Sequence, residues 1–277
     1  MNYSRRLALL IVFMLSFYSS SIAQIVVFPT TVIVSKSNRF GTFYVTNKSQ
    51  DPQQITISYK FGYPTSDSLG NIYMQYSDSI ASQKYSCAKW LKSYPSKFIL
   101  PPGQKQTIRM LISPPSNIHD GVYWTRLVTN SKPQVNFPDT TKNGVVTHIV
   151  FAVDHVTSIL FRNGKANPHV QILSLKTHRD QQGNMQFLAK LHRDGNAPFL
   201  GNTVLQIYDS NGKLVRTFNE PIAVYFDITK EFTLDTNKYS AGKYTARLTL
   251  NSQRDVLANH PMLKTSTITK KIAFKLK

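Results

Sequence analysis

The side chains that most often carry chemistry are histidine, cysteine and paired carboxylates, and in this chain they are few and scattered. There is one cysteine, Cys87, and there are 14 acidic residues. Paired carboxylates of the glycosidase kind remain an alternative that no pattern favours. The sequence contains no Gly-x-Ser-x-Gly, His-Glu-x-x-His or P-loop pattern. None of the seven histidines has zinc-ligand spacing with a third ligand nearby; they are His119, His148, His155, His169, His178, His192 and His260. We therefore predict a protein that is not an enzyme and that holds no metal or cofactor.

The chain is strongly basic, with 33 Lys+Arg against 14 Asp+Glu and a formal net charge of +19. Three interpretations are open: solvated strand faces, attraction to acidic partners or to an anionic envelope surface, and nucleic acid binding. No basic run is longer than Lys270-Lys271, so we expect no concentrated phosphate-binding patch and no nucleic acid partner. The hydrophobic content of 41% excludes a disordered chain, and the single cysteine excludes an internal disulfide framework.

The first 23 residues have the three parts of a secretory signal peptide. Arg5 and Arg6 form a positive start, residues 7–17 are apolar, and Ser21-Ile22-Ala23 offers small residues where a signal peptidase cuts. The apolar run is too short to span a bilayer comfortably, which argues against a membrane anchor. We predict cleavage before Gln24 and export to the periplasm, with no membrane segment in the mature chain.

After the signal peptide the sequence consists mainly of short β-rich runs between turn residues. Residues 41–46, 54–60, 106–112 and 121–128 include runs that alternate apolar and polar side chains, as half-buried antiparallel strands do. A longer apolar run at 145–161 has polar interruptions, and it fits two strand segments or one long strand with a bend. These patterns predict an all-β protein.

A polar, turn-rich stretch at residues 162–168 marks the predicted domain boundary. A second series of strands follows it, and in that series Asn211-Gly212 is a dipeptide preferred in type I′ hairpin turns. We predict two β-sandwich domains in tandem, one over residues 24–164 and one over residues 165–277. Both lengths are ordinary for such domains.

The stretch from Lys97 to Leu127 carries a motif that is more specific than the strand patterns described above. Phe98–Ile112 runs from one strand through Pro101-Pro102-Gly103 into another, and Asp120-Gly-Val-Tyr-Trp-Thr-Arg-Leu127 follows. In these residues the sequence resembles the first domain of the periplasmic pilus chaperones of the chaperone–usher pathway. The resemblance implies two immunoglobulin-like β-sandwich domains and a chaperone of exported pilus or fimbrial subunits.

The resemblance also implies a role for the last strand of the first domain. In the family this strand is lent to a pilus subunit that lacks one, so that the subunit's sandwich is completed by β-augmentation. The lending residues here would be Ile149, Phe151 and Val153, whose alternation points them to one face. The preceding stretch Asn130–Gly144 resembles the family's loop before that strand. The partners implied are an exported pilus-type subunit and an outer-membrane usher.

The sequence departs from the family in the cleft between the two domains. There the family uses an arginine and a lysine to hold the carboxylate at the subunit's C-terminus. The matching positions are Thr31 and Ser158, which carry hydroxyls and no positive charge. Asp120 and Arg162 match two positions of the family's interdomain ion cluster. The resemblance thus implies a divergent member with a cleft lined by these four residues.

Two functions follow from these observations, and a third, an anion-binding module for surface polysaccharide, rests on the charge alone. The long apolar strand and its preceding loop favour a strand-lending chaperone. The missing basic pair favours the alternative, a structural or adhesive β-sandwich protein of the cell envelope that has no client and covers the strand within its own fold. Lys165, Arg162 and Arg39 are the candidates that we consider for supplying the missing charge.

Overall fold

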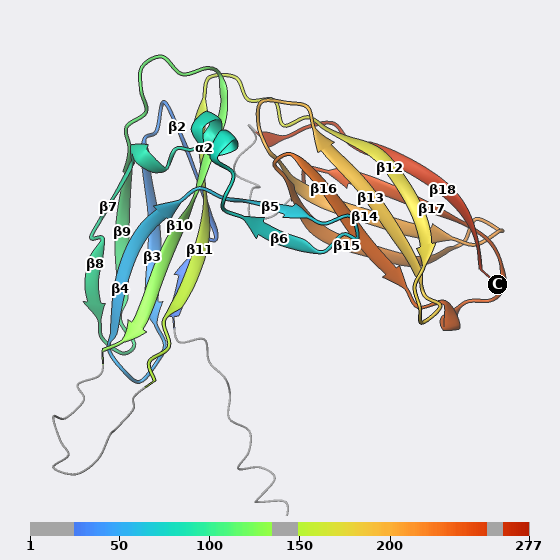
Figure 1. Ribbon diagram of the computed structural model, residues 1–277, viewed down its shortest axis with the longest axis horizontal. Helices are drawn as coiled ribbons and strands as arrows, with labels where there is room; N and C mark the ends of the chain where they lie inside the picture. The colour runs from blue at the N-terminus through green and yellow to red at the C-terminus, as the bar shows by residue number, and fades with distance from the viewer. Residues whose placement is uncertain (1–24, 135–148, 254–262, 277) are drawn as a thin grey trace, which may run out of the picture.

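The computed structural model describes residues 25–134, 149–253 and 263–276, so the predicted signal peptide lies outside the described residues. Within these ranges the chain is mostly β-strand and forms two sandwiches (Figure 1). β11 ends at Asn163 and β12 begins at Val170. The division between residues 164 and 165 stays a prediction. No helix in the described residues is long and apolar enough to cross a membrane.

The first sandwich consists of a four-stranded sheet packed on a five-stranded sheet. The four strands, in spatial order, are β1 (Ile25–Phe28), β3 (Phe40–Asn47), β9 (Lys105–Ile112) and β7 (Leu91–Tyr94). The five are β2 (Thr31–Ser35), β11 (Val153–Asn163), β10 (Gly121–Pro133), β4 (Gln53–Lys60) and β8 (Lys97–Leu100). β1 and β2 are joined by a short turn and belong to different sheets. The first strand therefore changes sheets.

The second sandwich repeats this plan with fewer strands. One sheet has the order β12 (Val170–Arg179), β13 (Met185–Arg193) and β16 (Asp227–Leu234). The other has the order β15 (Leu214–Val224), β14 (Phe199–Tyr208), β17 (Gly242–Asn251) and β18 (Ile268–Leu276). In an immunoglobulin fold the first, second and fifth strands share a sheet that faces the third, sixth and seventh. In the first sandwich β1, β3 and β9 share the sheet that faces β4, β10 and β11, and in the second β12, β13 and β16 share the sheet that faces β14, β17 and β18. The predicted fold class is therefore confirmed.

Period-two alternation explains how these strands bury their side chains. In β9 the residues at every second position, Ile108, Met110 and Ile112, are buried, while their neighbours are mostly exposed. They pack with Phe43 of the neighbouring strand β3 and with Phe161 of the facing sheet. The alternation seen in the sequence therefore reports which face of each strand lies against the core.

The Pro-Pro-Gly stretch forms the turn between β8 and β9. Gly103 has a φ of 71°, a left-handed conformation that favours glycine, and Gln104 N–H donates to the Pro101 carbonyl at 3.2 Å. Gly103 N–H donates to the Asn47 carbonyl at 3.0 Å, which ties the turn to the end of β3. The motif that carried the resemblance is thus a turn that connects the two sheets of the first sandwich.

The predicted type I′ turn at Asn211-Gly212 is wrong. A type I′ turn needs positive φ at both central residues, but among these residues only Gly212 has it, with a φ of 77°. The Asp209 carboxylate accepts hydrogen bonds from the N–H groups of Asn211 and Lys213, both at 2.9 Å. These bonds form a longer, side-chain-stabilised turn, and the β14–β15 register shifts by one residue beside it.

Between β4 and β7 the chain leaves the first sandwich and reaches toward the second. It forms the hairpin β5 (Tyr63–Ser66) and β6 (Ile72–Gln75), then the helices α2 (Ser79–Tyr85) and η1 (Ala88–Trp90); a further short helix, η2 (Thr236–Lys238), lies in the second sandwich. Figure 1 shows the hairpin extending alongside β16. Thr229 N–H donates to Ser66 Oγ at 2.7 Å, and Thr65 Oγ1 donates to the Asp227 carbonyl at 3.3 Å. The hairpin therefore bridges the two sandwiches.

Candidate functional site

The most unusual feature of the first sandwich is the outer edge of β11. On one side β11 pairs with β10 over its whole length, from Val153 to Asn163. On the other side β2 pairs with it only from Ser158 to Arg162. Among the described residues, no strand pairs with the outer edge of residues 153–157. An unpaired edge of this kind is a template for another β-strand.

The three residues predicted to be lent lie at this free end of β11. Ile149 and Phe151 are each 77% exposed and Val153 is 43% exposed. Farther along the same alternating positions, Ile159 and Phe161 are fully buried in the core. Ile149 and Phe151 precede the first paired residue, Val153, and the start of the predicted run, residues 145–148, lies outside the described residues. Ile149, Phe151 and Val153 thus occupy the same alternating positions in sequence as the core-facing residues of β11, but their apolar side chains are exposed.

His155 lies inside this free segment, opposite Thr129 of β10. Burial lowers the pKa of His155 from its ordinary value of 6.5, and the nearby Asp154 carboxylate opposes the effect only in part. The imidazole is therefore held toward its neutral form in the folded protein.

Thr31 and Ser158, the two hydroxyl residues predicted for the cleft, are brought together by parallel pairing of β2 and β11. The Ser158 hydroxyl is 3.3 Å from the Tyr225 hydroxyl of the second sandwich. Ser158 therefore lies at the contact between the sandwiches, with Thr31 beside it on the neighbouring strand.

Arg126, which the sequence analysis missed, occupies the position opposite Ser158 on β10. Its side chain is buried, its Nε donates to the Gly62 carbonyl at 3.0 Å, and its guanidinium lies 5.0 Å from the centre of the Tyr225 ring. Its Nη2 is buried with no hydrogen-bond partner among the described residues. A positive charge is thus present next to Ser158, supplied from the neighbouring strand. The sequence feature that could have identified Arg126 is a single charged side chain within the β-rich run 121–128.

A second buried arginine, Arg193, lies in an aromatic cluster at the same junction. Its guanidinium is 5.0 Å from the ring centre of Tyr85, 5.7 Å from that of Trp124 and 4.9 Å from that of Phe226. Its Nη2 donates to the Tyr85 hydroxyl at 3.2 Å. The ring faces stabilise this cation where water is excluded. In the described parts of the chain neither Arg126 nor Arg193 forms an ion pair, so the junction carries two buried positive charges without a counter-ion from the protein.

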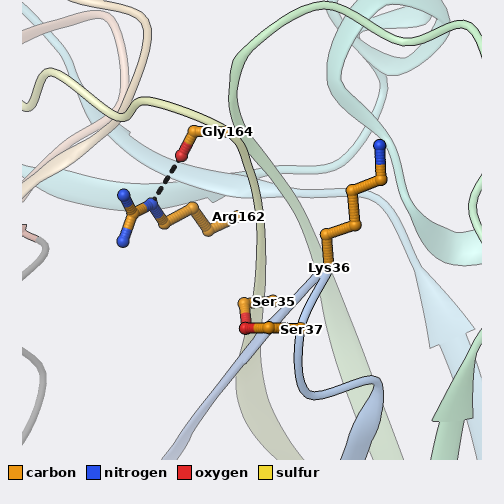
Figure 2. Close-up of a pocket in the computed structure, with 5 residues that line it drawn as sticks. All are labelled: Ser35, Lys36, Ser37, Arg162 and Gly164. Atoms are coloured by element: carbon orange, nitrogen blue, oxygen red, sulfur yellow. Dashed lines mark hydrogen bonds between the residues drawn. The ribbon is translucent and has the colours of Figure 1, made fainter.

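Arg162 lies farther along β11, at a pocket of about 450 Å³ lined by Ser35, Lys36, Ser37, Arg162 and Gly164. Figure 2 shows the Arg162 side chain extending toward Gly164, whose carbonyl accepts a hydrogen bond from Nε at 2.7 Å. The Lys36 side chain points away from Arg162 in the same view. Arg162 therefore holds the start of the interdomain connection.

Asp120 binds the same connection from the other side. Its carboxylate accepts a hydrogen bond from Lys165 N–H at 3.0 Å, and its carbonyl accepts one from Asn196 Nδ2 of the second sandwich at 3.1 Å. The ion pairs of the described residues do not join Asp120 to Arg162. Both residues contact the linker, so the predicted ion cluster is replaced here by hydrogen bonds to backbone groups.

The described residues include no group of three or more His, Cys, Asp or Glu side chains placed to hold a metal ion. Cys87 is fully buried in the first core, and burial raises the pKa of its thiol well above the ordinary value. The described residues thus place an open strand edge with exposed apolar side chains next to a junction that holds two buried arginines.

Comparison with solved structures finds pilus chaperones. The Pseudomonas aeruginosa CupB2 chaperone matches 89% of this chain and 98% of its own, with 12% identity and a TM-score of 0.44. The YadV chaperone matches 91% of this chain and 100% of its own, with 12% identity and a TM-score of 0.47. The chaperone–tip subunit complex CsuC–CsuE of Acinetobacter baumannii matches 89% of this chain and 98% of that chain, with 14% identity and a TM-score of 0.45.

No family model matches the chain, and no curated protein matches it. The likeness to the solved chaperones extends over most of the chain but is too distant to transfer a function. Function must therefore be argued from the residues and geometry of this chain.

Proposed function

We propose that the protein is a periplasmic chaperone that binds an exported β-sandwich subunit by adding residues 149–157 to it as a strand. The observation that carries this proposal is the unpaired outer edge of β11 together with the exposed side chains that precede and begin it. The predicted signal peptide, residues 1–23, would bring the protein to the compartment where such subunits fold. Subunits of a pilus and an outer-membrane usher are the partners that this role implies.

The energetics of strand addition suit these residues. A partner strand would satisfy the free backbone groups of residues 153–157, and a partner groove would cover Ile149, Phe151 and Val153. Full burial of an exposed Val, Ile or Phe side chain is worth about 1.5–3 kcal/mol. Because these side chains are already exposed in the free protein, little native packing is lost when a partner takes them. Coverage of the edge within the chain's own fold, as the structural alternative requires, has no support in the described residues.

We further propose that Arg126 replaces the family's basic pair. A carboxylate at the C-terminus of the subunit could accept hydrogen bonds from the hydroxyls of Thr31 and Ser158, with the Arg126 guanidinium behind them on the adjacent strand. Two opposite charges about 6 Å apart at an effective dielectric of about 20 attract by roughly 3 kcal/mol. The same negative charge would compensate a cation that is buried without a counter-ion, which is otherwise unfavourable.

The strand-addition proposal is tested by affinity purification of the tagged protein from its native cells, followed by mass spectrometry. Phe151→Asp is compared with Phe40→Asp, a matched control because Phe40 is 68% exposed on the opposite sheet. We expect a β-rich exported subunit to co-purify with the wild type and with Phe40→Asp but not with Phe151→Asp. Equal recovery with folded Phe151→Asp would refute strand addition and favour the structural alternative.

The carboxylate proposal is tested separately, with a peptide from the C-terminus of the captured subunit prepared as the free acid and as the amide. The wild type should bind the free acid about 10- to 100-fold more tightly than the amide, consistent with roughly 1.4 kcal/mol per factor of ten. Arg126→Met should bind the two forms equally. An Arg126→Met protein that still prefers the acid would show that another group holds the carboxylate.

A further inference from the structure

The outward face of the sheet β15-β14-β17-β18 brings like charges directly together. Antiparallel pairing of β17 with β18 places Lys243 opposite Lys275 and Arg247 opposite Lys271. Lys243, Arg247 and Lys275 alternate with buried side chains, and Lys271 is exposed between two partly buried neighbours, so all four lie on the solvent side of the sheet. Like charges directly opposite one another across a sheet are destabilising. The presence of two such like-charged pairs on one face therefore requires an explanation.

The described residues provide no counter-charge on this face. Its outward positions on these four strands carry no aspartate or glutamate. Glu220 of β15 is opposite the buried Thr203 and forms an ion pair with Lys230 of the other sheet. Asp209, at the end of β14, accepts hydrogen bonds from the backbone of its own turn. The four cations are thus left to an external anion.

Arg247 is positioned and yet incompletely bonded. Its guanidinium lies 4.9 Å from the centre of the Tyr208 ring, and the Tyr208 hydroxyl donates to Gln206 Oε1 at 3.0 Å. Arg247 Nε is buried with no hydrogen-bond partner among the described residues. The Tyr208 ring holds the guanidinium on this face of the sheet, and a planar guanidinium suits recognition of carboxylate or sulfate groups.

The other outward side chains indicate what carries those anions. The charged pairs alternate with hydroxyl and amide side chains, among them Thr245, Gln206, Asn202 and the pair Thr249 and Thr269, whose hydroxyl oxygens are 3.3 Å apart. Leu214, at the rim, is the one large and strongly exposed apolar side chain on these four strands of the described chain. A face with so few exposed apolar side chains fits a bilayer poorly, whereas hydrogen-bonding groups suit the hydroxyls of sugars.

We propose that this face binds a linear acidic polysaccharide. The two members of each pair lie about 5 Å apart across the strands, and the two pairs lie four residues apart along β17, or about 13 Å. A polymer with carboxylate or sulfate groups at regular intervals can contact both pairs at once, with its neutral hydroxyls on the threonines and amides between them. This surface belongs to the second sandwich and is separate from the edge of β11.

The test measures binding of the full mature protein to polygalacturonate by isothermal titration calorimetry, with neutral dextran and phosphatidylglycerol vesicles as comparison ligands. The double variant Lys243→Gln with Lys271→Gln removes one charge from each pair. The matched control, Lys176→Gln with Lys190→Gln, removes two exposed lysines from the opposite sheet of the same sandwich.

We expect polygalacturonate to bind the wild type and the control alike and to bind the Lys243/Lys271 variant at least tenfold more weakly. The same variant should melt at a higher temperature than the wild type, because cross-strand repulsion is relieved, so weaker binding would not reflect unfolding. Equal weakening in both variants would overturn the proposal in favour of non-specific charge. Binding to the vesicles but not to polygalacturonate would overturn it in favour of a membrane surface.

Discussion

Tyr225 joins the two sandwiches, and replacing it with alanine should uncouple their unfolding. The side chain is only 1% exposed although it belongs to the second sandwich. Its ring centre lies 4.9 Å from that of Trp124 and 6.4 Å from that of Tyr63, and the Arg126 guanidinium lies over it at 5.0 Å. Its hydroxyl contacts Ser158. All four neighbours come from the first part of the chain.

The expected loss of stability in Tyr225→Ala follows from these contacts. Truncation of a buried aromatic side chain to alanine costs about 3–5 kcal/mol, to which aromatic pairing contributes about 0.5–1.5 kcal/mol per pair and a desolvated cation–π contact about 2 kcal/mol. Because these contacts cross the junction, Tyr225→Ala should remove coupling between the sandwiches and leave each separate core intact. At about 2–4 °C per kcal/mol for a protein of this size, the less stable sandwich should melt about 10 °C lower.

Two measurements distinguish the sandwiches. The chain has two tryptophans: Trp90 packs against the first core, and Trp124 lies in β10 beside Tyr225. Tryptophan fluorescence therefore reports on the first sandwich and its junction, whereas calorimetry reports on both sandwiches. In the wild type the two melting curves should coincide, and in Tyr225→Ala they should separate. Tyr244→Ala is the control, because Tyr244 is buried within the second core and stacks on Phe274. Curves that still coincide in Tyr225→Ala, with a midpoint lowered by no more than about 2 °C, would refute the coupling.

Two further predictions concern titration and reactivity. The lowered pKa of His155 means that the folded state favours the neutral imidazole, so its contribution to stability is fully present above pH 6.5 and falls as the pH drops toward the lowered pKa. The urea midpoint of the wild type should decline over that range, and the midpoint of His155→Gln should decline less. Equal declines in the two proteins would contradict the lowered pKa of His155. Cys87 should resist iodoacetamide in the native protein and react once urea unfolds the chain, because the thiol is buried and its pKa is raised. Mass spectrometry measures the labelling, and rapid labelling of Cys87 in the native protein would contradict this prediction.

Local patterns in the sequence predicted much of the first sandwich. Alternation at 106–112 corresponds to β9, the β-rich run at 121–128 lies in β10, and Pro101-Pro102-Gly103 forms the turn before β9. These features could be read from the sequence because side-chain alternation and turn geometry depend on a few neighbouring residues. The Asn211-Gly212 turn was predicted wrongly because a carboxylate two residues earlier, at Asp209, competes for the same backbone groups.

The candidate site was only partly predictable, because it depends on pairing between strands that are far apart in the sequence. Ile149, Phe151 and Val153 were suggested by the family resemblance, but the free edge beside them depends on how far β2 extends along β11. Arg126 lay in a stretch of sequence that had been assigned to strand formation. Its position next to Ser158 appears only once β10 and β11 are aligned in register.

By itself the sequence determined the all-β class, the two sandwiches and the apolar run that ends the first one, because burial of alternate side chains is a property of each strand. Tertiary structure decided which edge stays open, which cations are buried at the junction and which charges face one another across β17 and β18. Those outcomes depend on pairing between residues far apart in the chain, since a shift of one residue in register turns every side chain of a strand to the other face.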